Sequence, residues 1–521
     1  MKNKSLYFFT FNLFSVTLIL LFQVLVYYSH HHQFTYPLDD TYIHLAIAKN
    51  ISEHGVWGLT PYEFSSASSS ILYTLLLSFI IHFFGNHFLI PLVINFLFFI
   101  LLIFSIHYIS KKEQFDFKTQ STLSIFIFFS PLPALIISGM EHITQLLIVT
   151  WLFYISSNYL QKNDIGLKNQ FLWFVIIVLS VAIRYESLFV IAGIFIILFF
   201  KKKYFIAIKV LLSALIPVIL YGIYSIQQGA YFLPNSLLLK GERPKLSLLG
   251  LFEYSHLWLD KLIHTPHLMV LFIVLSTLMI YALVKKETNS RRFYFLSLLL
   301  IAFTIHMVLA RVGWFYRYEA YLILLSGIVI TLYIKELHAF VDSLFKGKLL
   351  KFSFWVFLFI IFYPLTCRAI EAIKNISVSM ANINDQQMLM SDFISKYYEN
   401  ETIAANDIGA ISYYNPIYLV DIFGLANQDI MKLRAAKQYD RKHIQELCEK
   451  RNVAIAIIYK EWFSDKIPEN WVLCGQFSIE NNYICAEKEV YFYAVRPNES
   501  NYLSASLKSF SQSQKAVFKL Y

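Results

Sequence analysis

The sequence predicts a polytopic α-helical membrane protein that carries a small α/β domain at its C-terminal end. Three observations support this prediction. Of the 521 residues, 57% are hydrophobic and only 15% are charged, unlike an average soluble domain. Over residues 1–367, apolar stretches that can cross a hydrocarbon core of about 30 Å alternate with short polar loops. Residues 368–521 have ordinary hydropathy, which predicts a second domain outside the membrane.

The first span covers Ser5 to Tyr28 and contains no charged side chain. Tyrosines and histidines follow it instead of the small residues of a signal-peptide cleavage site, which predicts an uncleaved anchor. Lys2 and Lys4 precede it, and the positive-inside rule therefore predicts a cytoplasmic N-terminus. The first outer loop, residues 29–86, then lies outside the membrane.

The remaining apolar stretches follow in regular alternation with basic loops. Together with the first span they predict about eleven crossings of the inner or plasma membrane, the others being 87–109, 119–137, 143–160, 171–183, 187–200, 204–226, 266–284, 293–310, 319–334 and 352–366. The net charge of +10 lies largely in loops predicted to be cytoplasmic, so it does not indicate nucleic-acid binding. An odd number of crossings places the C-terminal domain outside.

Three apolar segments are short for a crossing. Ile71 to Phe84 has only 14 residues, about 21 Å of helix, which predicts a juxtamembrane or re-entrant helix started by the serines 68–70. Whether it spans the membrane is left open. The stretches 171–183 and 187–200 predict a hairpin whose tip dips into the membrane, and one long tilted helix is the alternative.

The C-terminal domain is predicted to contain a helix at 441–450 and strands at 453–459, 473–479, 483–487 and 489–496. Cys474 and Cys485 lie across one predicted hairpin, and an extracytoplasmic compartment permits a disulfide between them. Free buried thiols are the alternative.

The first candidate site is the acidic pair Asp39-Asp40, which opens a helix over residues 41–54 that Gly55 can end. Aspartate is a preferred N-cap residue, so one carboxylate is expected to cap the helix. A cap needs only one, and the second is available for chemistry. His44 lies one turn further on, where it can orient a base, join a metal site or be purely structural.

Further charged residues lie in the other outward loops. Glu141 follows a span that ends at a glycine, and with Asp40 and His44 it can hold a divalent cation such as Mg, Mn or Ca. Its alternative role is to begin the next helix. Arg184 and Glu186 are costly at membrane depth unless they pair or line a polar cavity. Two separate basic residues, Lys240 and Arg317, can bind a phosphate or lipid headgroups.

These motifs resemble, in order, those of the C superfamily of polyprenyl-phosphate-dependent glycosyltransferases (GT-C), nearest the cell-wall terminal arabinofuranosyltransferase group. The segments that carry the resemblance are Asp39-Asp40-Thr41-Tyr42-Ile43 with Ala48-Lys49-Asn50 and the serines 65–70, Ser138-Gly139-Met140-Glu141, Arg184-Tyr185-Glu186, Pro234-Asn235-Ser236 with Lys240, and Asn406-Asp407-Ile408-Gly409-Ala410 followed by Asp421 to Ala426. The proline expected after Arg184 is missing. The composition also differs from that of alanine-rich arabinosyltransferases, so arabinose is not carried over.

The resemblance implies transfer of a sugar from a polyprenyl-phosphate donor to an acceptor hydroxyl of a cell-envelope glycan, lipid or protein, with inversion. Asp39 or Asp40 would be the base, without a choice between them. The residues implied in binding the donor phosphate or sugar are Lys240, Arg317, Arg184, Glu186 and Asn235. The alternative function is a polytopic transporter or a lipid-linked-glycan flippase whose exterior domain binds a partner.

Overall fold

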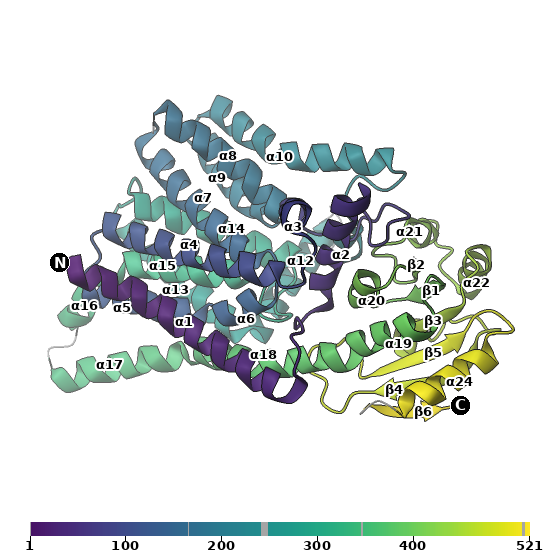
Figure 1. Ribbon diagram of the computed structural model, residues 1–521. Coiled ribbons are helices and arrows are strands. Elements are labelled where there is room, and N and C mark those ends of the chain that lie inside the picture. The colour runs from purple at the N-terminus through teal and green to yellow at the C-terminus, as the bar shows by residue number, and fades with distance from the viewer. Residues whose placement is uncertain (1, 165, 241–247, 345–346, 513–515) are drawn as a thin grey trace. The chain divides into compact units, whose positions relative to one another are not determined.

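The computed structural model describes residues 2–164, 166–240, 248–344, 347–512 and 516–521 (Figure 1). The helices of the first half are α1 Lys2–His31, α2 Asp39–His54, α3 Ile71–Phe84, α4 Ile90–Lys112, α5 Phe117–Phe129, α6 Leu132–Ile137, α7 His142–Lys162, α8 Leu167–Ile183, α9 Ser187–Phe200, α10 Tyr204–Gln227, α11 Asn235–Lys240 and α12 Leu248–His264. Those of the second half are α13 Pro266–Val284, α14 Arg291–Leu309, α15 Ala320–Leu332, α16 Ile334–Leu344, α17 Lys348–Ile361, α18 Tyr363–Ile383, the π-helix η1 Asn384–Met388, α19 Leu389–Tyr397, α20 Gly409–Tyr414, α21 Gln428–Ala435, α22 Arg441–Lys450, α23 Lys460–Phe463 and α24 Ser500–Ser511. The strands are β1 Thr402–Ala405, β2 Tyr418–Asp421, β3 Ile455–Ile458, β4 Val472–Ser478, β5 Glu489–Ala494 and β6 Val517–Leu520.

The chain forms two compact units, each made of three separate stretches. The helical unit comprises Met1–Gln23, Val93–Ile219 and Gly241–Lys374. The mixed unit comprises Val24–Leu92, Leu220–Lys240 and Asn375–Tyr521, and it contains every strand of the described sheet. The first outer loop therefore folds with the C-terminal residues. The predicted division after residue 367 falls inside α18 and stays a prediction.

Among the described residues, six helices are long and apolar enough to cross a membrane, or seven if the bent pair α17–α18 is counted as one span. The six are α1, α4, α7, α10, α13 and α14. Each of the eleven stretches expected to cross lies in helical structure, but α8, α9 and α15 are shorter apolar helices. One expected crossing, 119–137, is also interrupted at residues 130–131, between α5 and α6, and α8 and α9 are separated at residues 184–186, between the two stretches predicted as a hairpin. The alternative of one long helix over 171–200 is therefore wrong.

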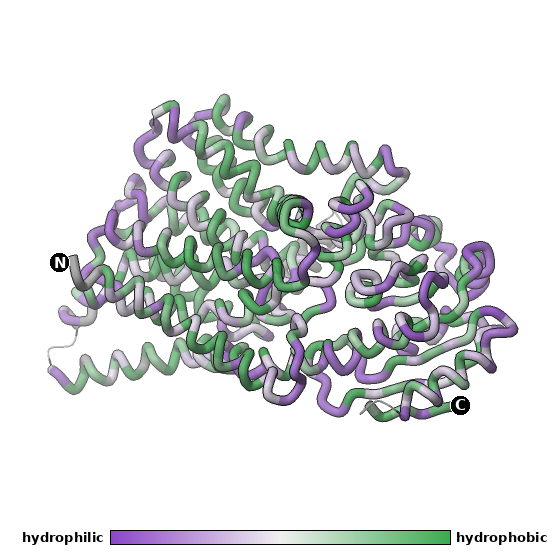
Figure 2. The backbone as a smooth tube through the Cα atoms, viewed as in Figure 1, coloured by the Kyte–Doolittle hydropathy of each residue, from purple (hydrophilic) through white to green (hydrophobic). Residues whose placement is uncertain are grey.

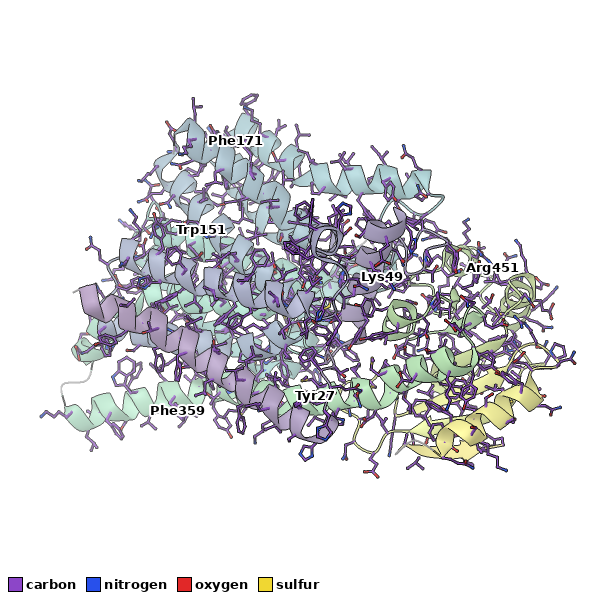
Figure 3. All side chains as sticks on the ribbon, in the orientation of Figure 1. Tyr27, Lys49, Trp151, Phe171, Phe359 and Arg451 are labelled. Carbon is purple, nitrogen blue, oxygen red and sulfur yellow. The ribbon has the colours of Figure 1, made fainter. Side chains whose placement is uncertain are left out.

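Many large apolar side chains of these helices are exposed. Phe171 on α8 is 73% exposed and Phe359 on α17 is 64% exposed (Figure 3). Figure 2 shows that hydrophobic residues predominate along several of these helices. Helices that are apolar all round belong in a lipid environment, because water would make this exposure costly.

The mixed unit is built around a six-stranded sheet of order β2-β1-β3-β5-β4-β6 (Figure 1). Strand β1 pairs in parallel with β2 and β3, whereas β5 and β4 continue the sheet in antiparallel fashion. Strand β6 pairs with β4 at the far edge. The carboxyl ends of the three parallel strands consequently meet at one edge of the sheet.

Helices cover both faces of this sheet. The side chains of β5 show the reason, because successive residues bury large rings on opposite faces. Tyr491 and Tyr493 point into a core that includes Ile430 of α21 and Leu447 of α22. Phe492 points the other way and lies 5.1 Å, between ring centroids, from Phe393 of α19. Alternate residues of a strand face opposite sides, so a strand buried on both faces is apolar throughout.

The C-terminal prediction is confirmed for the helix at 441–450 and for three of its strands. The strand expected at 483–487 is wrong, because these residues form bends in the loop between β4 and β5. The disulfide is also wrong, since Cys474 and Cys485 are free. The Cys485 thiol instead donates to the Gln387 side-chain oxygen at 3.4 Å.

Candidate functional site

The acidic pair lies in the first turn of α2, after the N-cap position. Leu38 occupies the N-cap position, and Gly55 ends the helix in the left-handed conformation as expected. The carboxylate of Asp39 instead accepts hydrogen bonds from the backbone N–H groups of Gly409 at 2.7 Å and Ala410 at 2.8 Å. The expected cap therefore exists, but it caps α20, which lies far along the chain.

Gly409 is required at this contact by close approach. A Cβ atom at this position would lie 2.2 Å from the Asp39 carbonyl oxygen, far inside contact distance. The absence of a side chain lets the backbone of α20 meet the start of α2. This contact places the acidic pair next to the distant segment Asp407-Ile408-Gly409-Ala410.

Burial raises the pKa of Asp39 to about 7, and the nearby charge of Asp407 contributes to the increase. Asp407 accepts a hydrogen bond from Gln387 at 2.6 Å and a short one from the Tyr459 hydroxyl. Asp407 and Tyr459 lie just past β1 and β3, at the carboxyl edge of the parallel strands. Ligand sites of open α/β sheets commonly form at this edge.

Asp40 is half-buried and adjoins Asp39 in the same turn. Consecutive residues of an α-helix are separated by about 100° around its axis, so the Asp40 side chain leaves the helix in a different direction from Asp39. The structure thus separates the two carboxylates that the sequence left equivalent.

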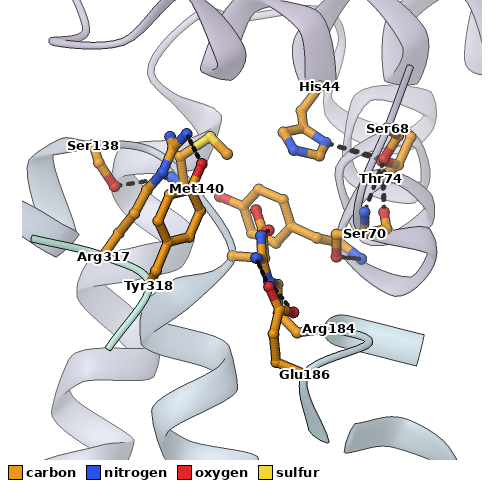
Figure 4. A network of polar contacts seen from close by, with 12 residues as sticks. His44, Ser68, Ser70, Thr74, Ser138, Met140, Arg184, Glu186, Arg317 and Tyr318 are labelled. Atoms are coloured by element: carbon orange, nitrogen blue, oxygen red, sulfur yellow. Dashed lines mark hydrogen bonds and ion pairs between the residues drawn. The ribbon is translucent and has the colours of Figure 1, made fainter. Parts of the chain in front are cut away.

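His44 of α2 is buried against residues 68–74. Its Nδ1 atom lies 3.1 Å from the Thr74 hydroxyl and 3.4 Å from that of Ser68 (Figure 4). The two hydroxyls are themselves 2.9 Å apart. Ser70 caps α3 by accepting from the Tyr73 N–H, as predicted. The residues 68–74 therefore fix the ring of His44.

In the helical unit, three of the predicted residues meet in one buried network. Arg184 donates to Glu141 at 2.6 Å and to Glu186 at 3.0 Å through Nε, with a further short contact to Glu186 (Figure 4). The Glu141 side chain is fully buried and that of Arg184 is 7% exposed. A guanidinium between two carboxylates satisfies charges that would be costly alone.

Tyr318 brings the second predicted arginine to this network. Its ring lies 5.0 Å from the guanidinium of Arg317 and 5.9 Å from that of Arg184. Arg317 is 3% exposed and donates to the Tyr318 hydroxyl at 3.2 Å (Figure 4). The loops around residues 141, 184 and 317, which the sequence predicts to face outward, thus converge within the helical unit.

Sequence reasoning missed Tyr318 and the ion pair between Glu319 and Arg368. Arg368 donates to Glu319 at 2.5 Å, and both side chains are almost fully buried. A usable signal existed, because Glu319 directly precedes an apolar stretch and Arg368 directly follows another. Charges placed so close to apolar helices need partners.

Asn235 and Lys240 lie at the two ends of α11. Asn235 is fully buried, its side chain donates to the Gly424 carbonyl at 3.3 Å, and its own N–H donates to the Ser66 carbonyl at 3.1 Å. The side chain of Lys240 lies outside the described residues. Asn235 therefore joins the first outer loop to the loop that follows β2.

That loop is organised by Asp421. Its carboxylate accepts from the N–H groups of Phe423 at 2.9 Å and Ala426 at 2.6 Å, and burial raises its pKa to about 6. Asp421 thus holds the turn that follows β2.

Within the described residues, no group of three or more histidine, cysteine, aspartate or glutamate side chains is arranged to hold a metal ion. Glu141 belongs to the helical unit, and Asp40 and His44 belong to the mixed unit. A cation at Glu141 would have to compete with the bound guanidinium of Arg184, so this carboxylate is poorly suited as a ligand. The metal site stays a prediction.

Comparison with solved structures identifies the fold. Two crystal structures of ArnT from Cupriavidus metallidurans, one bound to undecaprenyl phosphate and one in the apo state, each match with a TM-score of 0.50. The match covers 93% of this chain and 98% of ArnT, at 11% and 10% sequence identity. A family model described as a domain of unknown function (DUF8728) matches residues 381–493. No curated protein matches the sequence.

The expected fold is therefore confirmed: this is a polytopic helical membrane protein with the fold of ArnT and a small sheet in its C-terminal region. At 11% and 10% sequence identity, the likeness to ArnT shows the fold alone.

Proposed function

We propose that this protein, which has the fold of ArnT, transfers a sugar from a polyprenyl-phosphate donor to a hydroxyl of a cell-envelope glycan, lipid or protein. ArnT binds undecaprenyl phosphate, a carrier of this chemical class. The observation that carries the proposal is that two backbone N–H groups of α20 hold the Asp39 carboxylate, which supports Asp40, the other carboxylate of the pair, as the base.

Asp40 removes the proton from the acceptor hydroxyl as that oxygen attacks the anomeric carbon. The bond from this carbon to the phosphate oxygen breaks, and polyprenyl phosphate leaves with its electron pair. One displacement inverts the anomeric centre. Asp39 is a positioning residue, because its two backbone hydrogen bonds fix the start of the helix that carries Asp40.

The leaving phosphate needs a positive charge nearby, because its own negative charge grows as the bond breaks. Arg317 supplies it through a planar guanidinium that can form a two-pronged contact, and Lys240 adds a point charge. Arg184 is already neutralised by Glu141 and Glu186, so its proposed role, with Glu186, is to shape the polar pocket for the donor sugar. No step of this mechanism runs through a metal ion.

The N-terminus lies in the cytoplasm and transfer takes place on the outer face of the membrane. The carboxyl edge of the parallel strands, which holds Asp407 and Tyr459, steers the acceptor. The basic loops support the proposed orientation, and the contact between α2 and α20 supports the proposed role of this edge.

The test is transfer of radiolabelled sugar by purified protein in lipid nanodiscs, with a panel of polyprenyl-phosphate sugars and extracted envelope glycolipids as acceptors. We expect turnover with at least one donor and no loss with a chelator. If the chelator abolishes turnover, the result would support the metal site predicted from the sequence. If no donor supports turnover while labelled lipid crosses the bilayer of proteoliposomes, the flippase alternative is correct.

A further inference from the structure

The loop before Arg317 has an unusual backbone. Four consecutive residues adopt positive φ angles: 82° at Gly313, 38° at Trp314, 55° at Phe315 and 61° at Tyr316. L-residues with side chains rarely adopt this region, and large residues are outliers there. We call residues 313–316 the left-handed turn. Such backbone persists only where the surrounding structure holds it.

One buried ion pair contacts both ends of the left-handed turn. Glu319 accepts from the Gly313 N–H at 2.8 Å, and Arg368 donates to the Tyr316 carbonyl at 2.9 Å. The same Nη2 atom of Arg368 contacts Glu319 at 2.5 Å. Their side chains are 0% and 5% exposed, so water does not compete for these bonds.

The side chain of Trp314 contributes little to holding the turn, because it is 49% exposed. Arg317 follows directly and is 3% exposed. The direction in which its side chain leaves the backbone depends on the dihedral angles of the preceding residues. The left-handed turn therefore sets where the Arg317 guanidinium lies over Tyr318.

We propose that Glu319 and Arg368 are positioning residues that hold the left-handed turn so that Arg317 meets the donor phosphate. This inference rests on the proposed function, which assigns the phosphate to Arg317. It adds two residues of the helical unit, on α18 and just before α15, that contact no donor themselves.

The first test measures binding of tritiated undecaprenyl phosphate to protein in nanodiscs, together with KM for the sugar donor and for the acceptor. Glu319→Gln keeps a side-chain oxygen for Gly313 but loses its charge. We expect Kd and donor KM to rise at least about tenfold in this variant, since small displacements of a positioning group have effects of this size or larger. The acceptor KM should stay unchanged. Glu113→Gln is the matched control, because it also breaks an ion pair, with Arg291, far along the sequence from the turn.

The second test separates backbone geometry from folding. Trp314→Gly favours positive φ and Trp314→Val opposes it, while both remove the same half-exposed ring. We expect Trp314→Gly to bind undecaprenyl phosphate like the wild type and Trp314→Val to bind it at least about tenfold more weakly. Equal affinities for the two variants would overturn the inference.

Arg317→Gln distinguishes the two levels of the proposal. If this variant binds undecaprenyl phosphate like the wild type, the assignment of the phosphate to Arg317 fails. If it loses binding while Glu319→Gln and Trp314→Val do not, the phosphate role stands and the positioning role is wrong.

Discussion

Asp39 and Gly409 lie 370 positions apart in the sequence and are joined by a 2.7 Å hydrogen bond from the Gly409 N–H to the Asp39 carboxylate. The contact ties the start of α2 to the carboxyl edge of the sheet within one unit. It accounts for two motifs that a sequence presents as separate. It also separates the acidic pair into a structural residue, Asp39, and a candidate base, Asp40.

The first prediction concerns the fit at Gly409. Gly409→Ala places a methyl group against the Asp39 carbonyl, and Asp39→Asn puts an NH₂ group where one backbone N–H now donates. A hydrogen bond contributes about 0.5–1.5 kcal/mol, so both variants should melt at lower temperature than the wild type. Differential scanning fluorimetry in detergent measures this. Gly347→Ala, whose new methyl group would lie 4.0 Å from its nearest neighbour, a Leu350 side-chain carbon, is the control, and equal melting temperatures for all four proteins would contradict the contact.

A second prediction follows from the pKa of Asp39, which burial and Asp407 raise from 3.8 to about 7. Between these values the folded protein binds more protons than the unfolded chain, so the contribution of Asp39 to stability is largest at low pH and declines as the pH rises to 7. The wild type should therefore lose melting temperature relative to Asp39→Asn between pH 5 and pH 8. Asp260→Asn removes an exposed carboxylate as the control, and a difference that stays constant with pH would sink this prediction.

Much of the helical architecture could be predicted from composition, because long apolar stretches have few alternatives to helices in a membrane. The end of α2 at Gly55 and the cap of α3 at Ser70 also follow from local rules. These features depend on neighbours within four residues.

The features that could not be predicted from the sequence involve residues whose partners lie far along the chain. Asp39 was expected to cap α2, but its carboxylate accepts a hydrogen bond from Gly409 at the start of α20. The sequence alone does not show that these two residues are neighbours. Strands β1 and β2 have only four residues each, too few for a clear alternation. The positions of Glu319 and Arg368 beside apolar stretches indicate that each needs a partner, but only the structure shows that they are partners, with a contact of 2.5 Å.

A third prediction concerns Asn235, which the resemblance implies in donor binding. The side chain is fully buried and donates to Gly424, so Asn235→Ala should lower the melting temperature by the equivalent of about 1–3 kcal/mol. Its affinity for undecaprenyl phosphate should match that of the wild type. Reduced affinity at an unchanged melting temperature would instead assign Asn235 to the donor site.

The fourth prediction concerns the network at Arg184. Arg184→Met leaves the carboxylates of Glu141 and Glu186 buried without their partner, at a cost of about 3–5 kcal/mol. Glu141→Gln keeps a hydrogen-bond acceptor and should cost less. Thermal unfolding of both variants, compared with the double variant, measures the coupling. If Arg184→Met is no less stable than Glu141→Gln, the network does not hold these helices.

The most direct measurement compares Asp40→Asn with Asp39→Asn in sugar transfer, with melting temperatures recorded on the same preparations. Asp40→Asn should melt like the wild type and lose about 10²–10⁴-fold in kcat, the usual contribution of a general base. Asp39→Asn should lose stability and only a part of its activity. Full activity in Asp40→Asn, or loss of turnover at an unchanged melting temperature in Asp39→Asn, would contradict the assignment of Asp40 as the base.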